Sequence, residues 1–236
     1  MGEEPKLAVS EIFGPTFQGE GPSIGRPCLF LRLAGCNLAC SWCDTPYTWD
    51  WNRYDKSKEV SLRTMWSVMS ELRRLSRVHR QPIKHLVISG GEPMLQGKAL
   101  NTLCEWLRRE RWTTEIETAG TVLPPSLTFV DHYNVSPKLS NSDNPLEARY
   151  RPDVLDRLNE APSKAFKFVV EQPKDFNEID ELVNKHDLFP VYVMPEGIEA
   201  NQIHERLAEI ADEAIKRNYR ITTRLHVTIY GNQRGV

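Results

Sequence analysis

The sequence is short of the features that mark exported, membrane-spanning or nucleic-acid-binding chains. None of its apolar runs approaches the roughly 18–20 residues that cross a bilayer. The segment Met1–Lys6 is acidic and lacks the positive and then apolar pattern of a signal peptide. With 30 Lys plus Arg against 32 Asp plus Glu, the net charge of −2 gives no electrostatic reason to bind nucleic acid or an anionic membrane. We therefore expect a cytoplasmic protein that binds neither.

Internal repeats, low-complexity tracts and Gly/Ser-rich linkers are also missing, so residues 1–236 are predicted to form a single domain. Hydrophobic residues make up 40% of the chain, which is enough for a core without disulfides. The five cysteines are an odd number in a chain without an export signal, which argues against a disulfide framework. Cys28 and Cys104 lie in apolar patterns and are interpreted as small buried residues.

Strand-like apolar runs alternate with helical patterns along the chain, which predicts an α/β fold with helices outside a mainly parallel sheet. The predicted core strands are Cys28–Leu33, Lys84–Ser89, Thr113–Glu117, Phe129–Val135, Ala165–Val170 and Val191–Met194. A seventh run, Ile221–Ile229, is interpreted as a C-terminal strand. About six parallel strands favour a partial TIM-type barrel over a closed barrel of eight. Helices are expected after a cap at Ser61, over about Gly97–Arg109, after Asp175 and around Ile203–Ile215.

In parallel architectures the loops that follow the strands build the active site. The loop at about residues 35–55 follows the first core strand, and Gly90-Gly91-Glu92-Pro93 follows the second. Glu117-Thr118-Ala119-Gly120 follows the third. We expect these segments to meet at one rim of the sheet.

The first of these loops holds Cys36, Cys40 and Cys43 in a C-x3-C-x2-C spacing. Structural zinc takes four ligands, usually in two separated pairs, and the chain has no second C-x2-C and no H-x3-5-H pair. A catalytic zinc with three ligands and a water stays open. Three thiolates suit an iron–sulfur cluster better, because one iron of a four-iron cluster is then left open for chemistry.

The cysteine spacing with an aromatic residue before the third Cys, followed by Gly-Gly-Glu-Pro after the second strand, resembles the radical S-adenosylmethionine (SAM) superfamily. The resemblance implies the radical SAM fold, in which the three cysteines hold a [4Fe–4S] cluster whose open iron binds SAM. It places the Trp42 ring near the adenine and assigns Gly90, Gly91 and Glu92 to the methionine amino group.

Further segments narrow the resemblance to one family. They are Glu11–Gly21, Leu31–Gly35, Asp44-Thr45, Ser136-Pro137-Lys138 and Leu225–Val236. Together they resemble the 7-carboxy-7-deazaguanine synthases of deazapurine (queuosine) biosynthesis over nearly the whole chain. The resemblance implies a lyase that contracts 6-carboxy-5,6,7,8-tetrahydropterin to 7-carboxy-7-deazaguanine with loss of ammonia, SAM serving as a catalytic cofactor. It also implies Mg²⁺, a flavodoxin or ferredoxin-type reductant and a homodimer.

The same resemblance implies roles for further residues. It assigns Thr45 to Mg²⁺, against the alternative of a turn-capping Thr before Pro46. Glu117, Ser136 and Lys138 are assigned to SAM, although Glu117 could equally pair with Lys138. The residues assigned to the substrate, the last two in or after the predicted C-terminal strand, are Gln18, Gly19, Glu20, Arg32, His226 and Val236. No protein side chain is assigned as a catalytic group, because SAM carries the chemistry.

The functional roles of three cations are left open by the sequence. Arg32 alternates with apolar residues on the first core strand and could form a structural ion pair instead of binding a carboxylated pterin. Lys167 interrupts an apolar run, so it is predicted to need an acidic partner. Arg224 stands where relatives often carry Gln, which leaves the substrate contacts of that segment open.

Two other functions also stay open. A glycyl-radical-activating enzyme has the same cysteine spacing but acts on a protein and consumes SAM. A zinc-binding adaptor would hold metal on the cysteines without catalysis.

Overall fold

The computed structural model describes residues 5–124 and 126–236, so Met1 to Glu4 of the N-terminal segment interpreted above lie outside the described residues. Within them, nine strands form one sheet in the order β3-β1-β2-β4-β5-β6-β7-β8-β9. The strands are β1 Lys6–Phe17, β2 Pro27–Leu33, β3 Ser61–Thr64, β4 His85–Gly90, β5 Thr113–Thr118, β6 His132–Val135, β7 Lys164–Val170, β8 Val191–Pro195 and β9 Arg220–Ile221.

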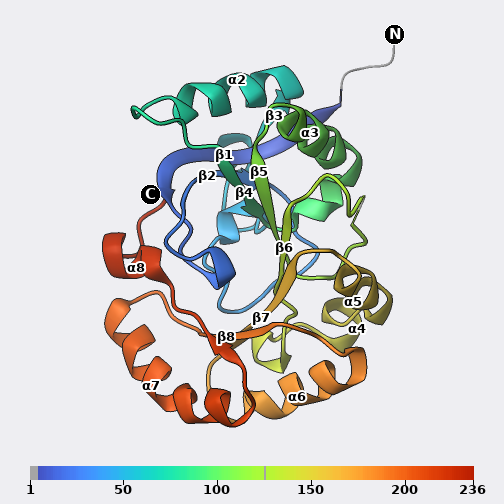
Figure 1. Ribbon diagram of the computed structural model, residues 1–236, viewed down its shortest axis with the longest axis vertical. Helices are drawn as coiled ribbons and strands as arrows, with labels where there is room; N and C mark the ends of the chain where they lie inside the picture. The colour runs from blue at the N-terminus through green and yellow to red at the C-terminus, as the bar shows by residue number, and fades with distance from the viewer. Residues whose placement is uncertain (1–4, 125) are drawn as a thin grey trace.

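Helices cover the outside of this sheet, as Figure 1 shows for α2, α3, α5, α6 and α7. The α-helices are α1 Lys56–Glu59, α2 Met65–Ser76, α3 Gly97–Arg109, α4 Leu146–Arg149, α5 Pro152–Asn159, α6 Asp175–His186, α7 Ala200–Lys216 and α8 Leu225–Tyr230. Short 3₁₀ turns are η1 Gly21–Ser23, η2 Pro46–Thr48, η3 Pro93–Gln96 and η4 Ser140–Ser142. None of the helices in the described residues has the length and apolar character needed to cross a membrane.

The six predicted core strands are confirmed as β2, β4, β5, β6, β7 and β8, which pair in parallel. Their ends lie close to the predicted ones, and the largest shift is at β6, which begins at His132 instead of Phe129. In the described part of the chain, β3 and β9 are the two ends of the sheet. The sheet is therefore an open, partial barrel, as predicted.

Two antiparallel strands were missed by the sequence interpretation. Strand β1 pairs antiparallel with both β2 and β3. Its register with β2 shifts between Val9 and Glu11 and again between Phe13 and Thr16. Each shift interrupts the alternation of buried and exposed side chains that marks a strand in a sequence. Strand β3 contains no buried residue, so it leaves no apolar signal.

Helix α2 begins later than predicted, since its cap is Thr64 and not Ser61. The Thr64 hydroxyl accepts a hydrogen bond from the Ser67 backbone N–H at 3.2 Å. Ser61 instead pairs with Val9 in the sheet. Leu62, which continues the helical spacing by chance, is 73% exposed. Helix α3 has its predicted bounds, and α6 begins at Asp175 as predicted.

The predicted C-terminal strand over Ile221–Ile229 is wrong. Strand β9 ends at Ile221, and Leu225–Tyr230 forms helix α8. Between them, Thr222 Oγ1 accepts a hydrogen bond from the Gly21 N–H at 2.9 Å, and the Leu225 N–H donates to the Gly19 carbonyl at 2.9 Å. After Ile221 the chain therefore makes hydrogen bonds with Gly19 and Gly21 and no longer forms a strand of the sheet. A short apolar run by itself does not distinguish a strand from a helix.

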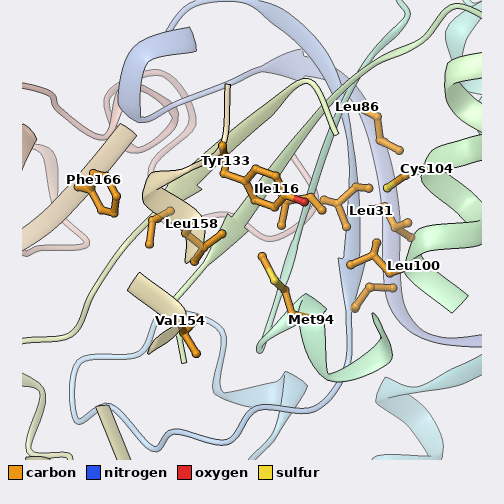
Figure 2. Packing of buried hydrophobic residues seen from close by; sticks show 14 of the residues in the cluster. Leu31, Leu86, Met94, Leu100, Cys104, Ile116, Tyr133, Val154, Leu158 and Phe166 are labelled. Carbon is orange, nitrogen blue, oxygen red and sulfur yellow. The ribbon is translucent and has the colours of Figure 1, made fainter. Parts of the chain in front are cut away.

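The hydrophobic core fills the space between the sheet and the outer helices. Figure 2 shows Leu31 of β2 and Ile116 of β5 in the same cluster as Leu100 and Cys104 of α3. Cys28 is 0% and Cys104 1% exposed, which confirms that both are buried residues. Each fully buried Leu or Ile side chain contributes about 1.5–3 kcal/mol through the hydrophobic effect.

Glycines at the end of β4 and directly after it allow two strand-end loops to meet. Gly90 has a φ of +145°, and a Cβ on it would lie 2.0 Å from the Leu33 carbonyl oxygen at the end of β2. A Cβ on Gly91 would lie 2.1 Å from the Gly35 carbonyl oxygen. The Gly91 N–H donates to the Leu33 carbonyl at 3.1 Å. The close approach of these two backbones therefore requires glycine independently of any ligand.

We predict that Gly90→Ala lowers the free energy of unfolding by about 2–5 kcal/mol, because the new Cβ meets backbone that cannot move aside. Gly25→Ala is the matched control, since Gly25 has a φ of +81° but nothing within 4 Å of its Cβ position. That substitution should cost only the left-handed strain of about 1–2 kcal/mol. Urea denaturation measures both, and equal losses would contradict the packing explanation.

Candidate active site

A cavity of about 400 Å³ lies among the loops that follow the parallel strands. It is lined by every residue that the sequence assigned to the site except Glu92. These lining residues are Gln18, Gly19, Glu20, Arg32, Cys36, Cys40, Trp42, Cys43, Thr45, Gly90, Gly91, Glu117, Ser136, Lys138, His226 and Val236. The fold thus brings residues from both ends of the chain to one place.

The three cysteines lie in the loop after β2, and each sulfur accepts one N–H group. The donors to Cys36, Cys40 and Cys43 are, in that order, the Leu38 backbone N–H at 3.4 Å, Asn144 Nδ2 at 3.2 Å and Trp49 Nε1 at 3.3 Å. Burial raises the pKa of Cys36 to about 12 and also raises the pKa of Cys40. Bound metal ions would have to displace these protons, as they do from coordinating thiols in general.

The donor set fits an iron–sulfur cluster better than a single zinc ion. Cys36, Cys40 and Cys43 all line one cavity. Soft thiolate ligands are those that such clusters use.

Trp42, Ser136 and Lys138 form one wall of the cavity. Lys138 Nζ donates to the backbone and side-chain oxygens of Ser136 at 3.0 and 2.9 Å and lies 5.6 Å from the centre of the Trp42 ring. The Trp42 Nε1 donates to the Asn141 carbonyl at 3.0 Å, which fixes the plane of the ring. An aromatic face beside a hydroxyl and a cation suits a nucleoside such as the adenosine of SAM.

Glu92 lies in the turn after β4, and its assignment to the methionine amino group stays a prediction. Its carboxylate is fully buried and accepts hydrogen bonds from the Thr118 hydroxyl at 2.9 Å, the Ala119 N–H at 2.8 Å and the Met94 N–H at 3.1 Å. Burial raises the pKa of Glu92 although these donors lower it. The carboxylate therefore ties the turn after β4 to the end of β5.

Gln18 and Glu117 contact each other on the opposite side of the cavity. Gln18 Nε2 donates to Glu115 at 3.0 Å and to Glu117 at 3.1 Å, so both of its N–H groups are engaged. The Gln18 side chain is buried, and burial raises the pKa of Glu117. In the described structure Glu117 therefore pairs with Gln18, and the alternative pair of Glu117 with Lys138 is not formed.

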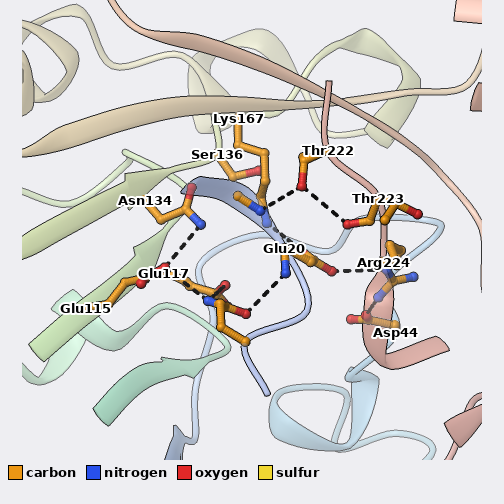
Figure 3. A network of polar contacts seen from close by, with 12 residues as sticks. Glu20, Asp44, Glu115, Glu117, Asn134, Ser136, Lys167, Thr222, Thr223 and Arg224 are labelled. Atoms are coloured by element: carbon orange, nitrogen blue, oxygen red, sulfur yellow. Dashed lines mark hydrogen bonds and ion pairs between the residues drawn. The ribbon is translucent and has the colours of Figure 1, made fainter. Parts of the chain in front are cut away.

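Buried charges surround Glu20, as Figure 3 shows. The Glu20 carboxylate accepts from Lys167 Nζ and from Arg224 Nε, the latter at 3.0 Å, and Arg224 also donates to Asp44. The side chains of Lys167 and Arg224 are only 6% and 9% exposed. Burial alone would raise the pKa of Glu20, but the two cations hold it well below its usual range. The acidic partner predicted for Lys167 is thus Glu20.

Thr45 places its hydroxyl close to the cysteines. It precedes η2, but its side chain makes no capping hydrogen bond there, so the capping alternative is not supported. The hydroxyl lies 3.8 Å from Cys43 Sγ. The neighbouring Asp44 carboxylate also lines the cavity, and hydroxyl and carboxylate oxygens are ligands that Mg²⁺ prefers.

Arg32 forms a structural ion pair and also lines the cavity, so its contacts agree with both of its predicted roles. Its Nε donates to Glu11 Oε2 at 3.1 Å, which is the structural ion pair, and its side chain also lines the cavity. Glu11 holds Arg234 as well, so one carboxylate fixes both this cation and the C-terminal tail that carries Val236. Figure 1 shows the C-terminus beside β1.

His226 lies on helix α8 and not on a strand, yet it reaches the cavity. Its ring packs against Gly19, where a Cβ would lie 2.0 Å from the His226 Nδ1. Burial lowers the pKa of His226, which favours the neutral imidazole at pH 7. The absence of a side chain at Gly19 is thus what lets this ring approach.

Several cavity residues were missed by the sequence interpretation, among them Phe13, Asp44, Trp49 and the tail residues before Val236. Asp44 had a usable signal, because it stands between Cys43 and Thr45. Trp49 had none, since an aromatic residue in a loop looks the same in a sequence whether it packs in the core or contacts a sulfur.

Comparisons with known proteins agree with this geometry. A family model described as a 4Fe-4S single cluster domain matches residues 17–136. The 7-carboxy-7-deazaguanine synthase of Pyrobaculum aerophilum is 36% identical over 100% of both chains. The synthase of Rhodopirellula baltica is 33% identical over 98% of this chain and 90% of its own. The crystal structure of QueE from Escherichia coli superposes with a TM-score of 0.71 at 27% identity, covering 94% of this chain and 95% of that one.

We predict that Glu20→Gln lowers the free energy of unfolding at pH 7 by about 3–5 kcal/mol, because it removes the counter-charge of two buried cations. The native structure holds the pKa of Glu20 below its ordinary value of 4.5. The ionised carboxylate therefore stabilises the fold above that pH, and this contribution is lost as the pH falls further. Urea denaturation at several pH values should show the wild type and the variant converging in acid.

Glu71→Gln is the control for this experiment. Glu71 pairs with Arg63 at 2.8 Å, but both side chains are more than a quarter exposed. A pair of this kind contributes about 0–1 kcal/mol. An equal loss of unfolding free energy in the two variants would show that the buried ion pairs of Glu20 stabilise the fold no more than an exposed pair does.

Proposed function

The chain belongs to the 7-carboxy-7-deazaguanine synthase family of radical SAM enzymes, and on this premise we propose that its cavity binds 6-carboxy-5,6,7,8-tetrahydropterin and contracts it to 7-carboxy-7-deazaguanine with release of ammonia. Its cofactors are a [4Fe–4S] cluster and SAM. The proposal rests above all on one observation: three cysteines, a diglycine and a set of charged side chains line a single cavity.

One side of the cavity suits the cofactors. Cys36, Cys40 and Cys43 would hold three irons of the cluster and leave the fourth for SAM. The turn of Gly90, Gly91 and Glu92 would receive the methionine end. The wall of Trp42, Ser136 and Lys138 would receive the adenosine. When bound and reduced, the cluster and SAM together supply one-electron chemistry that removes a hydrogen atom from the substrate.

The other side suits a polar substrate that carries a carboxylate. Arg32 gives only its Nε to Glu11, which leaves its terminal nitrogens for an anion. Thr45 and Asp44 offer oxygen ligands for Mg²⁺ beside that carboxylate. The pterin nitrogens would form hydrogen bonds with the carboxylates of Glu20 and Glu117 and with the neutral imidazole of His226. Binding and orientation by these groups are the contribution of the protein.

Three further features remain predictions: a homodimer, a flavodoxin or ferredoxin-type reductant, and a cytoplasmic location without nucleic-acid or membrane partners. The last is supported by Cys28 and Cys104, which are buried cysteines outside the proposed cluster site. The homodimer rests on family analogy alone.

The direct test is to reconstitute the cluster without oxygen and supply SAM, Mg²⁺ and 6-carboxytetrahydropterin. We predict the deazaguanine product by mass spectrometry, with little net loss of SAM. Cys40→Ser should abolish both product and SAM cleavage without unfolding, because a cluster ligand is lost while the core is untouched. Cys104→Ala, which changes a cysteine remote from the cavity, should keep both.

Each alternative has its own outcome in this test. SAM cleavage without product would keep the radical SAM chemistry and discard the pterin substrate. Stoichiometric SAM consumption that depends on a protein partner would indicate a glycyl-radical-activating enzyme. About one zinc per chain, with no iron–sulfur chromophore after reconstitution, would indicate a zinc-binding adaptor.

We predict that Thr45→Ala lowers turnover about tenfold at limiting Mg²⁺, with recovery at high Mg²⁺, because the hydroxyl is one of few metal ligands. Thr45→Ser keeps the hydroxyl and should behave like the wild type. Steady-state rates over a range of Mg²⁺ concentrations measure the effect. An unchanged Mg²⁺ dependence in Thr45→Ala would remove this residue from the metal site.

A further inference from the structure

The side-chain donors to the cysteine sulfurs are not part of the cysteine motif. Asn144 belongs to the segment between η4 and α4, 104 residues after Cys40. Trp49 follows η2, within the cysteine loop. Neither residue is needed to complete a cluster ligand set, and each places one N–H group against a sulfur.

The orientation of the Asn144 amide is determined by its surroundings. Its Oδ1 accepts the Ala39 backbone N–H at 2.8 Å, and only the oxygen end of an amide can accept such a bond. Nδ2 must therefore face Cys40 Sγ, at 3.2 Å. Asn144 is 9% exposed, and Nδ2 also reaches the Ser142 carbonyl at 3.2 Å. The side chain is held from several directions at once.

The segment around Asn144 is docked on the cysteine loop by further contacts. The Ser41 N–H donates to the Ser142 carbonyl at 3.2 Å, and Trp42 Nε1 donates to the Asn141 carbonyl at 3.0 Å. These bonds hold the segment against the cysteine loop through groups other than the Asn144 side chain, so they do not depend on the rotamer of Asn144.

The direction of the hydrogen bond between Trp49 and Cys43 is unambiguous, because an indole nitrogen can only donate. Its Nε1 lies 3.3 Å from Cys43 Sγ, and the residue lines the cavity. The nearby Trp51 provides a contrast. Its ring lies under Lys56 Nζ at 5.6 Å, so its contact is with a cation and not with a sulfur.

We propose that Asn144 and Trp49 are positioning residues that raise the reduction potential of the cluster by donating hydrogen bonds to two of its ligand sulfurs. Reduction adds one electron from an external donor of the ferredoxin or flavodoxin class, and no bond forms or breaks in that step. The added negative charge spreads onto the sulfurs, where N–H dipoles stabilise it. The proposal rests on the cluster and is independent of the substrate.

The test is redox potentiometry of the reconstituted protein without SAM or substrate, followed by the electron paramagnetic resonance of the reduced cluster. Trp49→Phe keeps an aromatic ring and removes the indole N–H donor. It should lower the ratio of reduced to oxidised cluster at a fixed potential about three- to tenfold, where tenfold equals about 59 mV for one electron. Trp51→Phe is the matched control and should leave the potential unchanged.

Asn144→Asp is the second variant. It keeps an oxygen for the Ala39 N–H but turns the group facing Cys40 into an acceptor, so it should lower the potential further than Trp49→Phe does. Asn52→Ala, an exposed asparagine in the same loop, is its control. If Asn144→Asp fails to retain iron, Trp49→Phe decides alone. Wild-type potentials in the variants that hold full iron and sulfide would overturn the proposal.

Discussion

The ion pairs around Glu20 hold together a sheet that strand pairing leaves open. Glu20 follows β1 near one end of the sheet order, whereas Lys167 lies on β7 and Arg224 follows β9 at the other end. One carboxylate thus joins the two ends across the cavity. Because both cations are buried, they need that carboxylate, and a buried charge left without a partner costs several kcal/mol. The cavity and the fold therefore depend on the same interaction.

The two sides of the cavity are held in different ways. On the cysteine side, neutral groups anchor much of the loop, such as Asn37 on Thr121 at 3.1 Å and Asn144 on the Ala39 backbone, although Arg224 also holds Asp44 beside Cys43. On the other side, charged groups such as Glu20 and Arg224 dominate. This division agrees with the proposed function, since an iron–sulfur cluster would be stabilised by N–H donors and a carboxylated pterin by charge and oxygen ligands.

Hydrophobic periodicity predicted the strands and helices that have regularly spaced apolar residues. It failed where contacts with residues distant in the sequence determine the local structure. The six core strands and helix α3 carry long, regular apolar patterns, and all were found. The residues after Ile221 also carry an apolar pattern, but their hydrogen bonds to Gly19 and Gly21 take them out of the sheet. Ser61 and Thr64 are equally good caps in isolation, and the pairing of Ser61 with Val9 chooses between them.

By itself the sequence determined the family and the cofactors and predicted a part of the residues that line the cavity, because the spacing of cysteines and glycines can be recognised in a short stretch of sequence. Only the tertiary structure decided what each side chain contacts. Glu92 belongs to the Gly-Gly-Glu-Pro motif, and its carboxylate accepts hydrogen bonds from Thr118 and Ala119. The Glu20 carboxylate is paired with cations that lie 147 and 204 residues further along the chain. The partner of a charged or polar group is set by whichever distant groups the fold places within about 3 Å, and no local pattern records that distance.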